Sequence, residues 1–368
     1  MRDIRVGKTG SDPTELTDVN GTLFFVAADG SHGRELWKSD GTATGTVLVK
    51  DIAPHGPNAL IHGLTAAGDR LYFVATKGGL PKVWVSDGTA TGTKAVYTPD
   101  KTLHYPAYGL AAGSRFYFVT WLGTNGAAQL WWTDGTTTKR VKGISGTDVG
   151  FDHNGSPSMA VVGQKVYLTV NDDLWRTDGT ASGTKMILEA NLGYGPTLMH
   201  ALGKKLVFLR GLNSNELWVS NGKREGTKQI YNIGDSAMSH AAMVDAGGWL
   251  FIARGYDYGM SYGTLWRTNG TNAGTDPVGF GKYDGPPQML TVVGDKLCFS
   301  VPDWEANDGL TWTLWQTDIT NFPWLTNKVA TFQMSWSGVS APAAVLNGSL
   351  IFNASDGITG FEPWLYTP

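Results

Sequence analysis

The chain has 368 residues and a formal net charge of −3, and only 17% of its residues are charged. Average chains carry roughly 25% charged residues. The lack of a basic run argues against nucleic acid as a partner. No stretch approaches the roughly 20 apolar residues of a membrane span. The single cysteine, Cys298, excludes an internal disulfide.

The remaining composition narrows the class of protein. Glycine (49) and tryptophan (15) are abundant, which is typical of all-β repeat proteins with many tight turns. Charged residues and glycine follow Met1 directly, unlike a secretory leader. We therefore expect a cytoplasmic monomer without a membrane partner, or a secreted protein if a leader has been removed.

The first predicted elements form an antiparallel meander. An Asn20-Gly21 pair and an Asp40-Gly41-Thr42 run are turn signals between short apolar runs. Four strands are predicted, at residues 15–19, 23–27, 35–38 and 47–52. Apolar runs resembling the second of these strands recur at residues 71–73, 116–118, 166–168, 206–208, 250–252, 297–299 and 350–352.

A tryptophan marks the third strand of each unit and gives the period. These residues are Trp37, Trp84, Trp131, Trp175, Trp218, Trp266, Trp315 and Trp364, spaced 43 to 49 residues apart. Four short strands in such a period are typical of a propeller blade. No convincing helical periodicity is present.

The two ends of the sequence predict how the repeat closes. The chain stops just after Trp364, inside a third strand, and residues 2–4 resemble residues 50–52 of a fourth strand. Pairing residues 2–6 with residues 363–366 closes a ring and removes two exposed edges. We predict a single-domain, all-β, eight-bladed β-propeller, with a seven-bladed ring as the alternative. The predicted blades are approximately 7–53, 54–100, 101–145, 146–190, 191–233, 234–281, 282–333, and 334–368 plus 1–6.

The run ELWKSDGTATGT, which starts at Glu35, resembles the ELWxxDGT-type repeats of bacterial β-propeller proteins. The resemblance covers nearly the whole chain and implies a propeller, but it implies no single activity. The motif degrades toward the C-terminus, where Asn221 and Asn269 replace the turn aspartate.

The Asp-Gly-Thr turns are interpreted as structural. Aspartate can accept hydrogen bonds from amides two residues on, and glycine tolerates positive φ. Calcium binding is the alternative, although the spacing differs from an EF-hand loop. The Leu-Trp pairs are expected to pack between blades.

Function is predicted at the opposite, variable face. Six of the seven histidines, all but His32, fall before or at the start of the first strand of a blade, where a ring brings them to its axis. Two long aromatic loops, 254–264 and 301–313, are expected at the same face and could form a lid. The proposed catalytic residues are His62, His200, His240 and Tyr108. The proposed substrate-binding residues are His104, Tyr105, His153, Tyr256, Tyr258, Tyr262, Trp304, Trp312 and Trp336.

Three functions remain open. The first is an enzyme-like funnel in which histidine and tyrosine transfer protons on a small organic molecule, as in cyclisation, elimination or hydrolysis. The second is a non-catalytic propeller that binds glycans or a protein, and the third is a structural module. No cofactor is predicted. A metal ion held by His62, His200 and His240 is a minority interpretation, because no H-x-H or H-x₃-H pair occurs.

Overall fold

The computed structural model describes most of the chain. The described residues are 3–5, 10–54, 58–77, 79–99, 104–122, 128–141, 144, 158–189, 195–211, 215–234, 240–255, 264–279, 287–303, 311–319, 326–333, 344–346, 348–354 and 362–368. Within them, one short 3₁₀ helix, η1 (Arg224–Gly226), is the only helix. No helix in this part of the chain is both long and apolar enough to cross a membrane.

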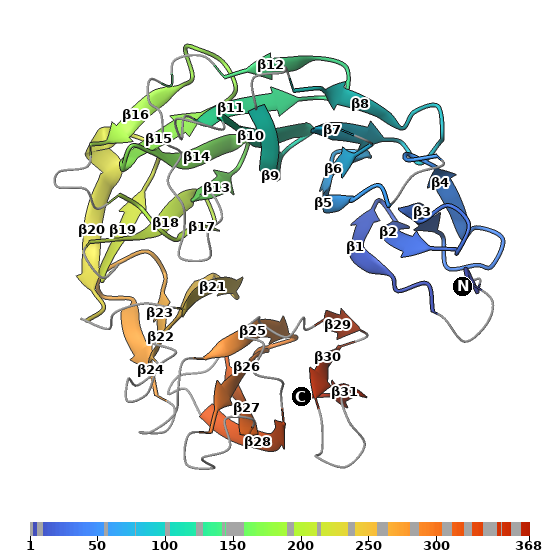
Figure 1. Cartoon of the computed structure of the whole chain (residues 1–368). Helices are drawn as coiled ribbons and strands as arrows, with labels where there is room; N and C mark the ends of the chain where they lie inside the picture. Colours follow the sequence, from blue (N-terminus) through green and yellow to red (C-terminus); the bar gives the residue numbers. More distant parts are fainter. Residues whose placement is uncertain are drawn as a thin grey trace. The chain divides into compact units, whose positions relative to one another are not determined.

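The first half of the chain forms four antiparallel sheets, numbered here in chain order (Figure 1). Sheet 1 contains β1 (Thr14–Val19), β2 (Thr22–Ala28), β3 (Arg34–Ser39) and β4 (Val47–Lys50). Sheet 2 contains β5 (His62–Ala67), β6 (Arg70–Thr76), β7 (Pro81–Ser86) and β8 (Lys94–Tyr97). Sheet 3 contains β9 (His104–Ala112), β10 (Arg115–Leu122), β11 (Ala128–Thr133) and β12 (Thr138–Arg140). Sheet 4 contains β13 (Met159–Val162), β14 (Lys165–Val170), β15 (Asp173–Thr177) and β16 (Lys185–Leu188).

The second half repeats the same order of strands. Sheet 5 contains β17 (Met199–Leu202), β18 (Lys205–Arg210), β19 (Glu216–Ser220) and β20 (Thr227–Asn232). Sheet 6 contains β21 (His240–Ala246), β22 (Trp249–Gly255), β23 (Thr264–Thr268) and β24 (Thr275–Val278). Sheet 7 contains β25 (Gln288–Val293), β26 (Lys296–Pro302), β27 (Thr311–Asp318) and β28 (Thr326–Gln333). Sheet 8 contains β29 (Ala344–Leu346), β30 (Ser349–Ala354) and β31 (Glu362–Tyr366). Eight blade-like sheets therefore confirm the predicted fold class.

Second strands carry continuous runs of buried residues. Phe24, Phe25, Val26 and Ala27 in β2 are all buried, and β6, β18 and β22 show the same continuous run. A strand that is covered on both faces reads as an unbroken apolar segment. The Asn20-Gly21 turn that precedes β2 has positive φ at both residues, as a two-residue hairpin turn requires.

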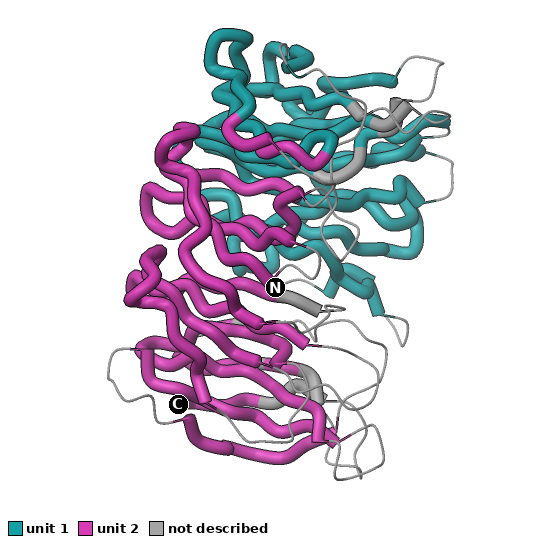
Figure 2. The backbone as a smooth tube through the Cα atoms, turned by 90° about the vertical axis from the view of Figure 1, so that its left-hand side faces the viewer, with its two compact units in different colours: residues 1–150, 163–171, 175–186 teal, residues 151–162, 172–174, 187–368 magenta. Residues whose placement is uncertain are grey.

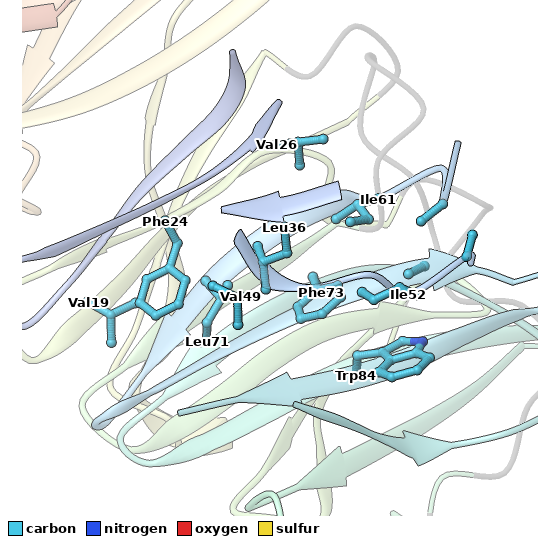
Figure 3. Close-up of a cluster of buried hydrophobic side chains, with 13 residues drawn as sticks. Val19, Phe24, Val26, Leu36, Val49, Ile52, Ile61, Leu71, Phe73 and Trp84 are labelled. Atoms are coloured by element: carbon cyan, nitrogen blue, oxygen red, sulfur yellow. The ribbon is translucent and has the colours of Figure 1, made fainter. Parts of the chain in front are cut away.

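The sheets pack face to face through their apolar side chains. Between sheets 1 and 2, Leu36 and Val49 meet Leu71, Phe73 and Trp84 in one buried cluster (Figure 3). In β3 the next residue, Trp37, points to the opposite face of sheet 1, where it packs with Phe25, Ala27 and Ile4. Leu36 thus packs against the following sheet, and Trp84 of sheet 2 packs against the preceding one in the same cluster. These contacts confirm the predicted packing between blades.

The Asp-Gly-Thr turns have the predicted structural role. Asp40 Oδ1 accepts hydrogen bonds from the backbone amide of Thr42 at 2.9 Å and from its hydroxyl at 2.7 Å. The amide bond recurs at Asp87, Asp134 and Asp178, and the side-chain oxygens of Asn221 and Asn269 accept it in sheets 5 and 6. An amide oxygen can replace the carboxylate because the turn needs an acceptor rather than a charge.

The chain divides into two compact units (Figure 2). Unit 1 comprises residues 1–150, 163–171 and 175–186, and unit 2 comprises residues 151–162, 172–174 and 187–368. In unit 1, β1 contacts β5 and β5 contacts β9; in unit 2, β13 contacts β17, β17 contacts β21, β21 contacts β25 and β25 contacts β29. The first strands of successive sheets are therefore neighbours within each unit. A single closed domain stays a prediction.

The main departures from the predicted strands concern the end of β4 and the predicted closing strand. The fourth strand of sheet 1 ends at Lys50 rather than at Ile52, because the Ile52 amide donates to a glutamate side chain instead of a neighbouring strand. No strand is assigned to residues 3–5, the described part of the predicted closing strand, and sheet 8 has three strands among the described residues. The pairing that would close the ring is not seen there, so closure stays a prediction.

Candidate functional site

The sheets have two chemically different ends. At one end lie the short turns, including every Asp-Gly-Thr turn. At the other end, the second strand passes to the third and the fourth strand connects to the next sheet; we call this the loop end. In sheets 1 and 2 much of the loop end is described, so a site can be built there from its residues.

An aspartate and a histidine are paired in the loop after β2. Asp29 Oδ2 lies 2.6 Å from His32 Nδ1, while Asp29 Oδ1 accepts the backbone amides of Ser31 at 2.8 Å and His32 at 2.9 Å. The Asp29 side chain is 16% exposed and the His32 side chain 44%. The turn therefore fixes the carboxylate, and the carboxylate in turn orients an imidazole that solvent can reach.

The pairing shifts the pKa of both groups. The hydrogen bond to Asp29 and the negative charge of that carboxylate raise the pKa of His32 above its ordinary value of 6.5. Burial works to raise the pKa of Asp29, but hydrogen bonds from the His32 ring and from two amides outweigh it and lower that pKa to about 2. Asp29 is therefore an anion at neutral pH, and its charge favours the protonated form of His32.

A third titratable group lies at the start of β3. Glu35 is fully buried, and its carboxylate accepts the amides of Ile52 at 2.9 Å and Ala53 at 3.3 Å. Burial raises the pKa of Glu35 to about 7, against the effect of these two hydrogen bonds. The same residue thus ties the segment after β4 to β3 and carries a proton that it can lose near neutral pH.

Polar contacts connect this loop to β1 and to the segment that leads into sheet 2. Arg34 Nη2 donates to the Thr14 hydroxyl on β1 at 2.8 Å, and the Arg34 amide donates to Asn58 Oδ1 at 3.0 Å. The Arg34 carbonyl accepts the Ala59 amide at 3.3 Å. These bonds fix the loop after β2 against the first strand of its own sheet and against the segment that leads into sheet 2.

The predicted histidines His62 and His200 lie on first strands, as expected. His62 begins β5, is exposed, and has Nδ1 3.2 Å from the Leu60 carbonyl. His200 is half-buried in β17 and has Nδ1 2.7 Å from the Ala201 carbonyl. A carbonyl accepts only, so both rings carry the proton on Nδ1 when neutral and leave Nε2 as the acceptor. His62 belongs to unit 1 and His200 to unit 2, so their meeting in one funnel stays a prediction.

Several other predicted site residues are placed by their backbone alone. His240 begins β21, and His104, Tyr105 and Tyr108 lie in β9. Tyr108 is the extra residue of a bulge, because Ala107 and Gly109 pair with the adjacent residues Val119 and Phe118. The residues that fall outside the described part of the chain are His153, Tyr256, Tyr258, Tyr262, Trp304 and Trp336.

The prediction that Trp312 lies in a long loop is wrong. It is the second residue of β27, where it pairs with Pro302 and Phe332 and packs against the core between sheets 7 and 8. The strands extend into both predicted loops, because β22 continues to Gly255 and β26 to Pro302. The next strands, β23 and β27, begin at Thr264 and Thr311, so strands also take up the last residues of both predicted loops.

Sequence reasoning missed His32, the one histidine set aside because it does not precede a first strand. The available signal was local. In Asp29-Gly-Ser-His32 the aspartate lies three residues before the histidine, and a single tight turn can bring the two side chains together. Within the described ranges, no three His, Cys, Asp or Glu side chains are grouped so that they could hold a metal ion.

Comparison with known proteins supports the fold assignment but gives no information about the site. No family profile matches the chain, and no curated protein matches its sequence. Among solved structures, one from a study of two prolyl endopeptidases matches with a TM-score of 0.50 and 12% identity, covering 93% of this chain and 54% of the other. A puromycin hydrolase mutant matches with a TM-score of 0.44, 11% identity and coverage of 96% and 59%. The tricorn protease matches with a TM-score of 0.38, 12% identity and coverage of 96% and 35%.

The chain covers less than two thirds of each of these structures. At such low sequence identity the similarity concerns the fold alone. It rests on the prolyl endopeptidase structure, which has a TM-score of 0.50. Together with the eight blade-like sheets, it identifies the fold as a β-propeller.

Proposed function

We propose that the loop end of the propeller binds a small organic molecule and transfers protons on it, with the Asp29–His32 pair as a general base. The observation that carries this proposal is the 2.6 Å contact between a largely buried carboxylate and an exposed imidazole. A purely structural turn would need only the two amide bonds that Asp29 Oδ1 already accepts.

The chemistry follows from the orientation of the ring. Asp29 accepts from Nδ1, so Nε2 is the acceptor atom of the neutral imidazole and faces away from the carboxylate. A carboxylate in this position fixes the tautomer and stabilises the imidazolium that forms when the base takes a proton. General bases that titrate near the working pH contribute about 10²- to 10⁴-fold to a rate.

Further residues of the loop end fit a small-molecule site. His62 presents the same Nδ1-protonated tautomer on the neighbouring sheet, and the buried Glu35 anchors the start of β3 behind the loop. Leu60, 63% exposed, adds an apolar surface next to His62. The funnel predicted from the sequence, with His200, His240 and Tyr108, and the predicted aromatic lid remain part of the proposal.

Nitrobenzisoxazole is a suitable probe because its ring opening needs only a base. The base takes the ring C–H proton, the C–H electrons complete a C≡N bond, and the N–O bond breaks to leave a phenolate whose colour reports the rate. An aryl ester tests hydrolysis in parallel. We expect turnover by the wild type, and a loss of at least about 10-fold in His32→Gln, without a change in melting temperature.

Asp18 offers a matched control for Asp29. Its Oδ1 accepts the Gly21 amide in a turn at the opposite end of sheet 1, and the donor in that contact is a backbone amide rather than a histidine ring. Asp29→Asn should slow the probe reaction, whereas Asp18→Asn should not. Equal rates in wild type and His32→Gln would contradict the catalytic proposal; saturable ligand binding at this end without turnover would instead favour the glycan- or protein-binding alternative.

A further inference from the structure

We propose that the backbone amides of Met289 and Leu290, at a bulge in β25, form a binding site for a carboxylate-bearing small molecule. This site lies in unit 2, on the first strand of sheet 7. The inference does not rest on the proposed function, because it uses no residue of the Asp29–His32 pair. It comes from a β-bulge that recurs in the first strands. In sheet 2 the backbone amides at this bulge already bind a carboxylate of the chain itself, that of Glu15.

The bulge that already binds a carboxylate lies in sheet 2, and the carboxylate comes from sheet 1. Glu15 Oε2, on β1, accepts the backbone amides of Gly63 at 3.1 Å and Leu64 at 3.3 Å on β5. Gly63 has φ of +67° and sits in a bulge, because β5 advances from His62 to Thr65 while β6 moves only from Val74 to Tyr72. Successive amides around a left-handed residue converge on one point and make an anion-binding concavity.

The same bulge occurs at the same place in sheet 7. β25 advances from Gln288 to Thr291 while β26 moves only from Ser300 to Cys298. Met289 has φ of +54° and lies four residues before the end of its strand, as Gly63 does in β5. β5 and β25 are first strands that pair on one side only, so the other edge of each is open to the neighbouring first strand, and in sheet 2 this is where the Gly63 and Leu64 amides meet Glu15.

The two bulges differ in the side chains that the neighbouring first strand presents. β21 lies beside β25 as β1 lies beside β5, and the residues of β21 at the level of Glu15 are Ala242 and Met243. Met243 packs into the core between sheets 5 and 6, and Ala242 is exposed. A methyl group cannot accept a hydrogen bond. In sheet 7, β21 therefore supplies no carboxylate to the Met289 and Leu290 amides, which correspond to the amides that bind Glu15 in sheet 2.

The left-handed backbone at the bulge recurs in three first strands, at Glu15 with φ of +60°, at Gly63 and at Met289. Glycine adopts this conformation freely, whereas a residue with a side chain holds it only where its surroundings impose it. Two converging N–H groups suit one carboxylate oxygen, as the single Oε2 of Glu15 shows.

The test follows the Met289 amide directly by NMR. The chain has nine methionines, so a sample labelled with heavy nitrogen at methionine alone gives at most nine amide peaks. Met289→Leu identifies the peak of interest. We expect this peak to shift saturably on titration with sodium acetate and to stay in place with acetamide or with sodium chloride at matched ionic strength.

Ala242→Glu places a carboxylate on β21 at the level that Glu15 has on β1, and Ala242→Gln is its matched control. In Ala242→Glu we expect the Met289 peak to be displaced before any acetate is added and to respond no further. In Ala242→Gln the response to acetate should persist. A wild-type peak that does not move with acetate, or an undiminished response in Ala242→Glu, would overturn the proposal.

Discussion

The carboxylate of Glu35 accepts the backbone amide of Ile52 at 2.9 Å while the Glu35 side chain is completely buried. This contact ends β4 two residues early and anchors the segment that leads into sheet 2. It also places a group with a pKa of about 7 inside sheet 1.

Glu35 makes stability depend on pH. Its pKa rises from an ordinary value of 4.5 to about 7, so the folded state holds the proton more tightly than the unfolded chain. The free energy of unfolding should therefore fall as the pH rises from about 4.5 to about 7, by at most about 3 kcal/mol. Glu35→Gln keeps an acceptor oxygen without titrating. Melting curves should show a flatter pH dependence in this variant; identical slopes in the two proteins would contradict the assignment.

The turn aspartates should matter for stability through their acceptor atoms. Asp134 Oδ1 accepts the amides of Thr136 at 2.9 Å and Thr137 at 2.7 Å. Asp134→Ala should lower the free energy of unfolding by about 0.5–1.5 kcal/mol per bond lost. Asp134→Asn should cost less, since Asn221 and Asn269 make the corresponding amide bond in their own turns. Urea unfolding measures both, and an equal loss in the two variants would show that charge rather than hydrogen bonding matters.

Glu15 should behave as an internal ligand of β5. Glu15→Ala removes the acceptor from the Gly63 and Leu64 amides and should lower the melting temperature. Sodium acetate should restore part of that loss in the variant by occupying the vacated amides, whereas acetamide should not. An acetate effect of the same size on the wild type would indicate a general salt effect and count against this mechanism.

Ring closure can be tested with a disulfide, because the only native cysteine, Cys298, is buried. Leu365 on β31 is 67% exposed, which makes it accessible for a crosslink. Closure predicts that Leu365→Cys forms a disulfide with Asp3→Cys or Arg5→Cys under mild oxidation, detected by mass spectrometry. Failure of both double variants to crosslink, while each remains folded, would argue for an open array.

The repeat made the fold predictable, but finer features depend on contacts between repeats. The eight tryptophans and the Asn20-Gly21 turn indicate four-stranded sheets from local sequence alone. The early end of β4 was not predictable, because it depends on Glu35 reaching across from β3. The bulge at Met289 was equally hidden, since methionine gives no sign of positive φ, whereas Gly63 is at least permissive.

The candidate site was only partly predictable for a similar reason. Histidines on first strands are visible from the repeat, and His62 and His200 lie where the sequence predicts. His32 was overlooked because its importance comes from a turn that brings it onto Asp29. Trp312 was misplaced because a strand boundary moved past it and turned a predicted loop residue into a packing residue.

The most direct test of the proposed proton transfer compares two titrations of the same residue. The NMR titration of the His32 ring gives its pKa, which should lie above 6.5 and fall in Asp29→Asn. The rate of nitrobenzisoxazole ring opening should rise with pH through that same pKa, and its midpoint should fall equally in Asp29→Asn. A rate profile whose midpoint stays fixed while the His32 pKa falls would show that another group is the base.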